Sequence, residues 1–230
     1  MKIGAVIIAR YNSSRLYGKV LKEIHGTPAL EHTYNRLRKV LKDDQIIIAT
    51  SDESSDDPIA KFAKQKGWNV FRGSLNNAAQ RFLEASRFMD WEYAIRTNGD
   101  NIFIDLKCFK EMYEAAEKGG HDFLTNVKNR TFPKGMSIEI VKTDFYEKCF
   151  DLIKGDADYE EHVTLALYQH NLGNYQYFYN TEIKELQGIQ LALDTPEDFE
   201  RINKLITSLG ANYENYTLLN IKNAYEQLDR

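Results

Sequence analysis

Short apolar runs alternate with longer segments in which apolar residues recur every three or four positions, and this alternation occupies the first half of the chain. The first run, Ile3–Ala9, is rich in β-branched residues and has the length of a buried strand. From Pro28 onward, Leu30, Tyr34 and Leu37 are spaced to line one face of a helix, and proline is favoured in a first helical turn. The chain therefore opens with a predicted strand, a polar loop and a predicted helix.

The same two patterns predict three more strands and three more helices before residue 120. The expected strands are Gln45–Thr50, Trp68–Phe71 and Trp91–Thr97, and the expected helices are one that Pro58 opens, Asn76–Phe88 and Leu106–Lys118. Strands that alternate with helices across short connections are typical of a parallel sheet with helices on both faces. We therefore expect an α/β three-layer sandwich with a mostly parallel central sheet.

After Gly120 the pattern changes, and strands no longer alternate regularly with helices. The expected strands are Asp122–Lys128, Met136–Lys142, Tyr175–Tyr179 and Gln190–Leu193, and the expected helices are Tyr159–Gln169, one after Pro196 and Thr217–Leu228. The loop 129–135 would join the first two of these strands. Because no repeat or low-complexity linker divides the chain, we expect one domain over residues 1–230 whose second half adds mixed strands.

Composition and charge narrow the classes of function. Hydrophobic residues make up 43% of the chain and charged residues 28%, which are ordinary globular values. The 30 Lys and Arg against 34 Asp and Glu give a net charge of −4, so nothing draws the whole protein to nucleic acid or anionic lipid. Two cysteines are too few for a disulfide framework, and the longest apolar run is shorter than the ~20 residues of a spanning helix. We expect a cytoplasmic protein without a nucleic-acid or membrane partner.

The polar loop after the first strand is a candidate binding site, because ligands of open α/β sheets bind at the carboxyl ends of the strands. It lacks the glycine fingerprints of dinucleotide and phosphate loops. Within ten residues it holds three cations and two hydroxyl groups: Arg10, Arg15, Lys19, Ser13 and Ser14. Such a set suits a triphosphate, which needs several charge-assisted donors. A solvated basic loop is the alternative interpretation.

Two carboxylates follow other predicted strands. Asp100 lies in a tight turn after Trp91–Thr97, and Asp194 follows Gln190–Leu193. Carboxylates from separate strand ends can share Mg²⁺, which prefers oxygen ligands. For Asp194 or its neighbour Thr195, the alternative role is to cap the following helix.

Two further polar features favour a structural interpretation. His162 lies near the start of a predicted helix, where surface histidines are common. The acidic stretch Asp52–Asp57 is expected to be a solvated loop. No His/Cys cluster has the spacing of a zinc site.

Taken together and in order, these motifs resemble those of a known family. The matching residues are Ala9, Arg10, Ser13, Arg15, Leu16, Gly18 and Lys19, then Ala49-Thr50, Asp56-Asp57-Pro58, Phe71–Ser74, Arg96–Asp100, Glu161–Thr164 and Asp194–Asp198. The chain resembles the cytidylyltransferases of bacterial surface-polysaccharide synthesis, especially the spore-coat polysaccharide type. These are related to the enzymes that make CMP-activated 3-deoxy-octulosonate and sialic acids.

The resemblance implies a fold of the nucleotide-diphospho-sugar transferase type and a magnesium-dependent reaction. An acceptor oxygen would attack the α-phosphorus of CTP, and pyrophosphate would leave. By position, Arg15 and Lys19 would hold the β- and γ-phosphates, and Asp100 and Asp194 would bind Mg²⁺. Arg15, Lys19 and Asp100 are thus the expected catalytic residues.

The resemblance also implies two halves, residues 1–119 for the nucleotide and 120–230 for the acceptor and for dimerisation. The expected nucleotide-binding residues are Ala9, Arg10, Ser13, Ser14, Arg15, Lys19, Thr50, Arg72, Gly73, Arg81 and Asn98. The expected acceptor-binding residues are Lys134, Glu139, Glu161 and His162. A homodimer would form partly through residues 128–142.

Departures from the family pattern leave nucleotide and acceptor open. Tyr17 replaces a proline, Asn76 and Asn77 replace acidic residues, Lys134 replaces an aspartate, and Ser137 stands where a second aspartate is common. A lysine at this place would suit a phosphate or carboxylate of a sugar acid, sugar phosphate or polyol phosphate. The alternatives are a guanylyltransferase that makes a GDP-sugar, a glycosyltransferase of the same sheet type, and a non-catalytic nucleotide-binding protein.

Overall fold

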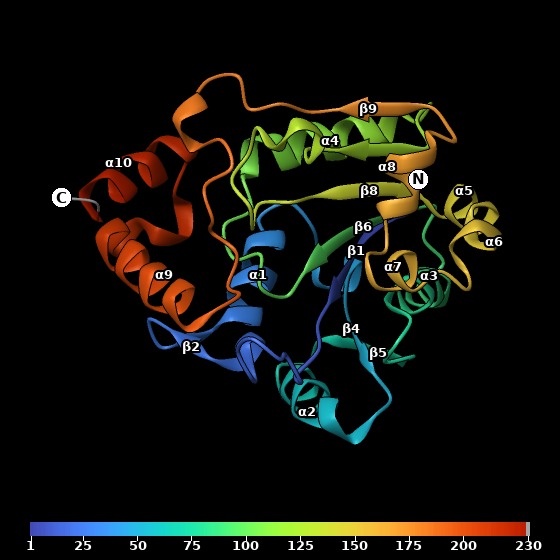
Figure 1. The fold of residues 1–230 in the computed structure, drawn as a ribbon, viewed down its shortest axis with the longest axis horizontal. Coiled ribbons are helices and arrows are strands. Elements are labelled where there is room, and N and C mark those ends of the chain that lie inside the picture. The colour runs from blue at the N-terminus through green and yellow to red at the C-terminus, as the bar shows by residue number, and fades with distance from the viewer. Residues whose placement is uncertain (229–230) are drawn as a thin grey trace.

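A seven-stranded sheet with the order β5-β4-β1-β6-β8-β7-β9 forms the centre of the structure (Figure 1). The structure is a computed structural model. It describes residues 1–228, apart from the side chains of residues 211, 212 and 214. The strands are β1 (Ile3–Ile8), β4 (Ile46–Ser51), β5 (Asn69–Gly73), β6 (Tyr93–Asn98), β7 (Phe123–Thr125), β8 (Glu139–Lys142) and β9 (Tyr175–Tyr177). Only β8 runs antiparallel to its neighbours, so the sheet is mostly parallel, as predicted. Because strands of both halves share this sheet, the two halves are structurally continuous.

Helices cover both faces of the sheet. They are α1 (Ala29–Leu37), α2 (Asp57–Gln65), α3 (Ala78–Phe88), α4 (Leu106–Lys118), α5 (Thr143–Lys148), α6 (Phe150–Ile153), α7 (Ala157–Glu161), α8 (Leu165–His170), α9 (Pro196–Leu209) and α10 (Leu218–Leu228). Within β4, Ile46 and Ile48 pack into the cluster that holds α1, α2, α4, α9 and α10. Ile47 and Ala49 point to the opposite cluster, with α3, α5, α6 and α8. Burial on both faces explains why the central strands are apolar at consecutive positions.

The strand order reverses at β1, which pairs with β4 on one side and with β6 on the other. Ile8, at the carboxyl end of β1, is in register with Asn98 at the end of β6, so the loops that follow begin side by side. The Gly99 amide donates to the Ile8 carbonyl at 2.9 Å. A side chain at Gly99 would place its Cβ 3.1 Å from Leu30 Cδ1 and 3.2 Å from Ala9 Cβ, so the turn is closely packed. Such a reversal is where open sheets form a binding crevice.

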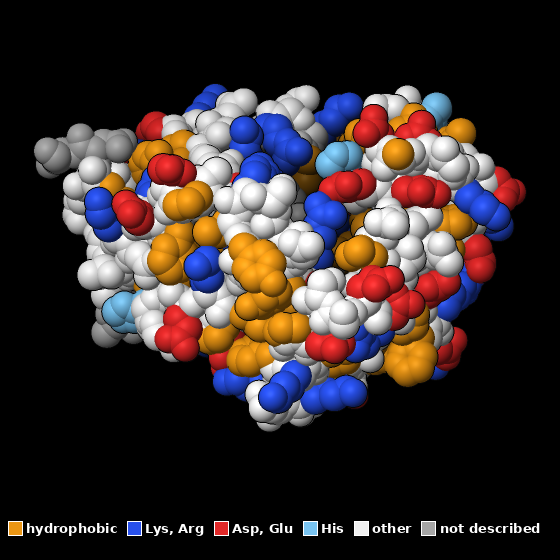
Figure 2. Space-filling view, turned by 60° about the horizontal axis from the view of Figure 1, so that its bottom comes forward, with side chains coloured by type: hydrophobic (Ala, Val, Ile, Leu, Met, Phe, Trp, Pro, Cys, Tyr) orange, Lys and Arg blue, Asp and Glu red, His pale blue; other side chains and the backbone are white. Residues whose placement is uncertain are grey.

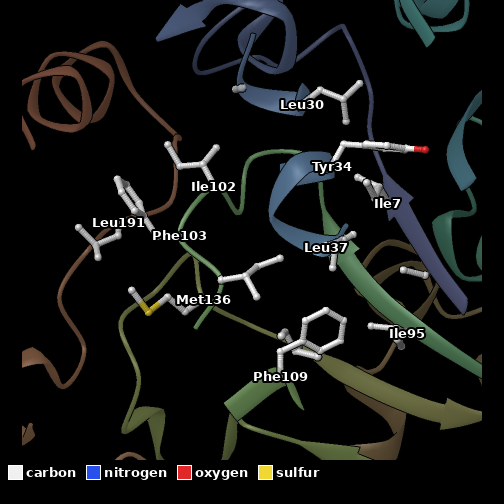
Figure 3. Packing of buried hydrophobic residues seen from close by; sticks show 14 of the residues in the cluster. Ile7, Leu30, Tyr34, Leu37, Ile95, Ile102, Phe103, Phe109, Met136 and Leu191 are labelled. Atoms are coloured by element: carbon white, nitrogen blue, oxygen red, sulfur yellow. The ribbon is translucent and has the colours of Figure 1, made fainter. Parts of the chain in front are cut away.

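The hydrophobic core joins segments that are remote in the sequence. Ile102, Phe103, Met136 and Leu191 lie close together in one buried cluster (Figure 3). These four residues come from the segments after β6, before β8 and before α9. Their packing brings the chain near Asp194 to the same end of the sheet as the loops after β1 and β6.

Several second-half predictions were wrong in detail. The expected helix Tyr159–Gln169 is interrupted between α7 and α8, because His162 has non-helical backbone angles. Next to the interruption, the Thr164 hydroxyl donates to Glu139. The expected strand Gln190–Leu193 is reduced to one parallel bridge between Gln190 and Lys134. The helices α5 and α6 of the second half, and a short hairpin of the first half, β2 (Glu23–Ile24) and β3 (Thr27–Pro28), are additional to the predicted elements.

A side chain shortens two expected strands. The expected Asp122–Lys128 and Met136–Lys142 shrink to β7 and β8 because buried Asn126 takes over the pairing between them. Its amide donates to the Met136 carbonyl, and its oxygen accepts from the Ile138 amide, both at 2.8 Å.

No helix among residues 1–228 combines the length and apolar composition needed to cross a membrane.

Candidate active site

A cavity of about 1010 Å³ opens at the carboxyl end of the sheet. Its walls come from the loops after β1 and β6, the start of α3, the segment between β7 and β8, the α7–α8 junction and the chain before α9. Figure 2 shows one face with a hollow flanked by Lys and Arg side chains and with a histidine and acidic side chains along one rim. The cavity residues are thus mainly those of the loops that the strand reversal brings together.

Lys19, Asp100 and Asp194 meet at one end of this cavity. Lys19 Nζ lies 2.5 Å from Asp100 Oδ2 and 2.9 Å from Asp194 Oδ1. Arg15 Nη2 also lies 2.9 Å from Asp194 Oδ1. Two carboxylates and two cations from three separate loops therefore form one cluster.

Helix capping does not explain Asp194. Thr195 is the N-cap of α9: its hydroxyl accepts from the Asp198 amide, and the Asp198 carboxylate accepts from the Thr195 amide. The carboxylate of Asp194 is left to bind Lys19, Arg15 and Gln190.

Within this cluster, the pKa values of Lys19 and Asp194 are shifted towards their charged forms. Burial lowers the pKa of Lys19, but the adjacent Asp100 and Asp194 outweigh burial and leave this pKa raised. Burial raises the pKa of Asp194, yet the hydrogen bond and charge of Lys19 bring the net pKa below its usual range. Lys19 is thus a firmly protonated cation with a side chain only 12% exposed.

The two carboxylates also fit a magnesium ion. Asp100 Oδ1 is buried and has no hydrogen-bond partner among the described residues, so a lone pair is available to a cation. Within the described part of the chain, no cluster of three or more His, Cys, Asp or Glu side chains could hold a metal. Mg²⁺ commonly binds through one or two carboxylates together with water and substrate phosphates, which is the set that Asp100 and Asp194 offer.

A buried aspartate anchors the loop after β1: the stretch Asp52–Asp57 is mostly exposed, as expected, but Asp56 is an exception. Asp56 is fully buried, and its carboxylate accepts from the Tyr11 amide at 2.6 Å and from the Ser51 amide at 2.9 Å. Burial raises its pKa, but the hydrogen bonds from Ser51 and Tyr11 leave the net pKa below the usual value. The anchor ties the loop that carries Arg10, Arg15 and Lys19 to the end of β4.

The expected nucleotide residues fall into two groups. Those that line the cavity are Ala9, Arg10, Arg15, Lys19, Arg81 and Asn98, and those that do not are Ser13, Ser14, Thr50, Arg72 and Gly73. Arg72 instead holds the Asp52–Asp57 loop: it donates to the Ser51 and Glu53 carbonyls at 2.8 Å and pairs with Asp57. Thr50 is buried inside β4, so neither of these two residues faces the cavity.

All four expected acceptor residues, Lys134, Glu139, Glu161 and His162, line the cavity. Glu139 is 3% exposed and accepts from Arg96 Nη1 at 3.0 Å, Thr164 Oγ1 at 2.7 Å and the Tyr168 hydroxyl at 2.6 Å. Burial and the adjacent Glu139 raise the pKa of Tyr168 far above its ordinary value, so Tyr168 stays a donor.

Several cavity residues escaped sequence reasoning. Arg96, Thr164 and Tyr168 surround Glu139, and Arg130 lines the cavity from the segment after β7. Arg96 and Thr164 belong to the family motifs Arg96–Asp100 and Glu161–Thr164, so their place in these motifs could have indicated a role in the site. Neither Arg130 nor Tyr168 carries a signal in the sequence alone.

Comparison with known proteins identifies the family. A family model described as cytidylyltransferase matches residues 5–227. The chain belongs to this cytidylyltransferase family. It is therefore a nucleotidyltransferase, and the match favours cytidylyl transfer over the guanylyltransferase, glycosyltransferase and non-catalytic alternatives.

Relatives and solved structures agree with this assignment. The cytidylyltransferase is 32% identical over 210 residues to the spore coat polysaccharide biosynthesis protein SpsF of Bacillus subtilis, covering 89% of this chain and 86% of SpsF. It is 34% identical over 201 residues to an uncharacterized protein of Methanocaldococcus jannaschii, covering 87% and 81%. A solved cytidylyltransferase from Leptospira borgpetersenii superposes with a TM-score of 0.89 at 28% identity, covering 100% of this chain and 95% of that one. The expected fold class and family are thereby confirmed.

Proposed function

We propose that this cytidylyltransferase transfers cytidine monophosphate from CTP to an oxygen of a small sugar-type acceptor and releases pyrophosphate. The observation that carries the proposal is the cluster of Arg15, Lys19, Asp100 and Asp194 at one end of the cavity. Two cations suit the polyphosphate, and two carboxylates suit a divalent cation that accompanies it. Ala9, Arg10 and Asn98, which also line the cavity, are the proposed contacts of the nucleoside.

In the proposed reaction, the acceptor oxygen attacks the α-phosphorus, and the bond from that phosphorus to the bridging oxygen of the β-phosphate breaks. Negative charge then develops on the leaving pyrophosphate. Arg15 and Lys19 would donate hydrogen bonds to it, and the raised pKa of Lys19 keeps this side chain charged at neutral pH. Such electrostatic stabilisation is the main demand of phosphoryl-type transfer.

Asp100 and Asp194 are the proposed ligands of Mg²⁺. The bound ion would neutralise charge on the phosphate oxygens of the nucleotide. In support, both groups are hard oxygen donors, and Asp100 Oδ1 has no partner among the described residues.

The acceptor would occupy the part of the cavity formed by the second half of the chain, near Lys134, Glu139, Glu161 and His162. Similarity to SpsF, and the 32% identity over 130 residues to a 3-deoxy-manno-octulosonate cytidylyltransferase of Geotalea daltonii, support a sugar acid, sugar phosphate or polyol phosphate used for bacterial surface glycans. The homodimer through residues 128–142 stays a prediction. Since β8 lies between β6 and β7, both of its backbone edges are already paired, and the segment before β8 is the proposed contribution to that interface.

Thermal unfolding with CTP, GTP, UTP and ATP, each with and without Mg²⁺, tests the proposal. A ligand at about 100 times its Kd adds about 2.7 kcal/mol, which at this size raises the midpoint by several degrees. We expect a magnesium-dependent shift that is largest with CTP and is lost in Arg15→Gln. The matched control is Arg38→Gln, because Arg38 is exposed and pairs with Asp43 outside the cavity. A shift with GTP alone, or an equal CTP shift in Arg15→Gln, would contradict the proposal.

A further inference from the structure

Two exposed cations of the cavity have no carboxylate partner among the described residues. Seven Lys and Arg side chains line it: Arg10, Arg15, Lys19, Arg81, Arg96, Arg130 and Lys134. Four of them form ion pairs: Arg10 with Glu161, Arg15 with Asp194, Lys19 with Asp100 and Arg96 with Glu139. Arg81 is 1% exposed and donates to the Ser74 carbonyl. Arg130 and Lys134 are exposed and form no ion pair with any described residue, and Arg130 has only a 3.5 Å contact with Ser137 Oγ. An anionic ligand would supply the missing counter-charge.

The backbone that carries these two cations is held firmly. The Lys134 amide donates to the Ile189 carbonyl at 2.8 Å, and the Leu191 amide donates to the Lys134 carbonyl at 2.9 Å. Gly135 has a φ of +92°, and a Cβ at this position would lie 2.5 Å from the Ala192 amide nitrogen, so the segment packs too closely for any other residue. Lys134 is thereby fixed beside the chain that leads to Asp194.

Arg130 is held in a conformation that its own sequence disfavours. Asn129 and Arg130 have φ values of 60° and 49°, in the left-handed region that residues other than glycine seldom adopt. The chain on both sides of this turn is fixed: Asn126, before it, binds the Met136 carbonyl and the Ile138 amide, after it, and Asn101 donates to the Ser137 carbonyl at 3.2 Å. Surrounding structure maintains such backbone angles, and they concentrate at ligand sites.

One of the two unpaired cations, Lys134, lies near the proposed reaction centre. The parallel bridge places Gln190 against Lys134, and Gln190 Nε2 lies 3.4 Å from Asp194 Oδ2. An anion bound at Lys134 would therefore lie close to the proposed magnesium ligand, and Arg130 lines the same cavity. Because Arg15 and Lys19 already serve the triphosphate in the proposed function, this second pair is left for the other substrate.

Among the described residues at the acceptor end, Glu139 and Glu161 are already paired, and the other groups that could act as a base, Asp158 and His162, are exposed. Glu139, the most buried carboxylate of the cavity, accepts from three donors, and Glu161 pairs with Arg10 at 2.6 Å. A hydroxyl nucleophile needs a group that removes its proton. A phosphomonoester carries about −1.5 to −2 charges at pH 7 and needs none.

We propose that Arg130 and Lys134 bind the phosphate of a phosphomonoester acceptor, whose phosphate oxygen is the nucleophile; this inference rests on the proposed function. The oxygen forms a bond to the α-phosphorus of CTP as the bond to the bridging oxygen of the β-phosphate breaks. The product has a new P–O–P linkage, pyrophosphate takes the electron pair of the broken bond, and no proton is transferred. A carboxylate-bearing sugar acid that reacts through a hydroxyl is the outcome that would replace this proposal.

Inorganic phosphate, the smallest such nucleophile, provides the test, with CTP and Mg²⁺ saturating so that the triphosphate positions are filled. Wild type should convert phosphate and CTP slowly to CDP and pyrophosphate, whereas acetate at equal concentration should yield no CMP adduct. Arg130→Gln and Lys134→Gln should each raise the phosphate concentration for half-maximal rate at least tenfold, and Lys134→Arg should restore most of the loss. The matched control is Lys128→Gln, because Lys128 belongs to the same loop but stacks over Tyr177.

The outcomes separate this inference from the proposed function. If CTP with Mg²⁺ does not stabilise the wild type, the proposed function itself fails. If CTP stabilises the wild type but phosphate yields no CDP, or Lys128→Gln is impaired as much as Lys134→Gln, the inference is wrong and the proposed function stands. Loss of CTP stabilisation in Arg130→Gln and Lys134→Gln would assign both cations to the nucleotide and also overturn the inference.

Discussion

Substitution of Asp56 tests how the loop after β1 is held in place. Its carboxylate accepts from two backbone amides, the buried one of Ser51 and the partly buried one of Tyr11. A hydrogen bond to a charged group contributes about 1.5–3 kcal/mol, and Asp56→Ala would remove two of them and leave two amides without a partner. We therefore expect a loss of about 3–5 kcal/mol in the free energy of unfolding, or a drop in midpoint on the order of 10 °C. Urea unfolding followed by circular dichroism measures the loss.

The neighbouring Asp57 is the matched control. Its side chain is 60% exposed and pairs with Arg72, and surface pairs of this kind contribute below about 1 kcal/mol. Asp57→Ala should therefore leave stability nearly unchanged. If Asp56→Ala loses less than about 1 kcal/mol more than Asp57→Ala, the two amides are not held by the carboxylate as described, and the reasoning fails.

Substitution of Asp56 should also change the KM for CTP, and its effect on stability should depend on pH. The loop that Asp56 anchors carries Arg15 and Lys19, so the milder Asp56→Asn should raise the KM for CTP roughly tenfold, the equivalent of one lost hydrogen bond. Because the folded-state pKa of Asp56 is depressed, its contribution to stability is present above the unfolded pKa near 3.8 and is lost as pH falls through the lower folded value. The stability gap between wild type and Asp56→Asn should therefore close in acid, and a gap that widens below pH 4 would refute this assignment.

Three further substitutions have defined outcomes. Asp100→Asn should lower kcat about 100-fold or more with a native circular dichroism spectrum, and a magnesium titration of the residual rate should show weakened dependence. Gly135→Ala should destabilise the fold by about 1–3 kcal/mol in thermal unfolding, because φ is +92° and a Cβ would lie 2.5 Å from the Ala192 nitrogen. Glu139→Gln should lower the unfolding free energy by about 3 kcal/mol in urea, because it breaks a buried ion pair with Arg96, and a loss below about 1 kcal/mol would argue against this pair.

Local sequence patterns predicted most of the first half of the fold. The run Ile3–Ala9 became β1, and the helical spacing after Pro28 became α1, because period and burial are encoded by neighbouring residues. Prediction failed where a distant side chain replaces backbone pairing. The side chain of Asn126 binds the Met136 carbonyl and the Ile138 amide between the end of β7 and the start of β8. Glu139 accepts a hydrogen bond from Thr164, which lies in the interruption of the expected helix. No local window of sequence contains both partners of these bonds.

The same division applies to the site. The sequence by itself determined which chemical groups follow the strands: cations after β1, a carboxylate after β6 and another before α9. Only the tertiary structure decided which of them meet, since Lys19 and Asp194 are 175 positions apart and come together through core packing and the bridge at Gln190. It also decided that Thr195 caps α9, that Asp56 is buried, and that Arg72 lies outside the cavity. The physical reason is that residue type and spacing set local conformation, whereas burial and charge pairing depend on long-range contacts.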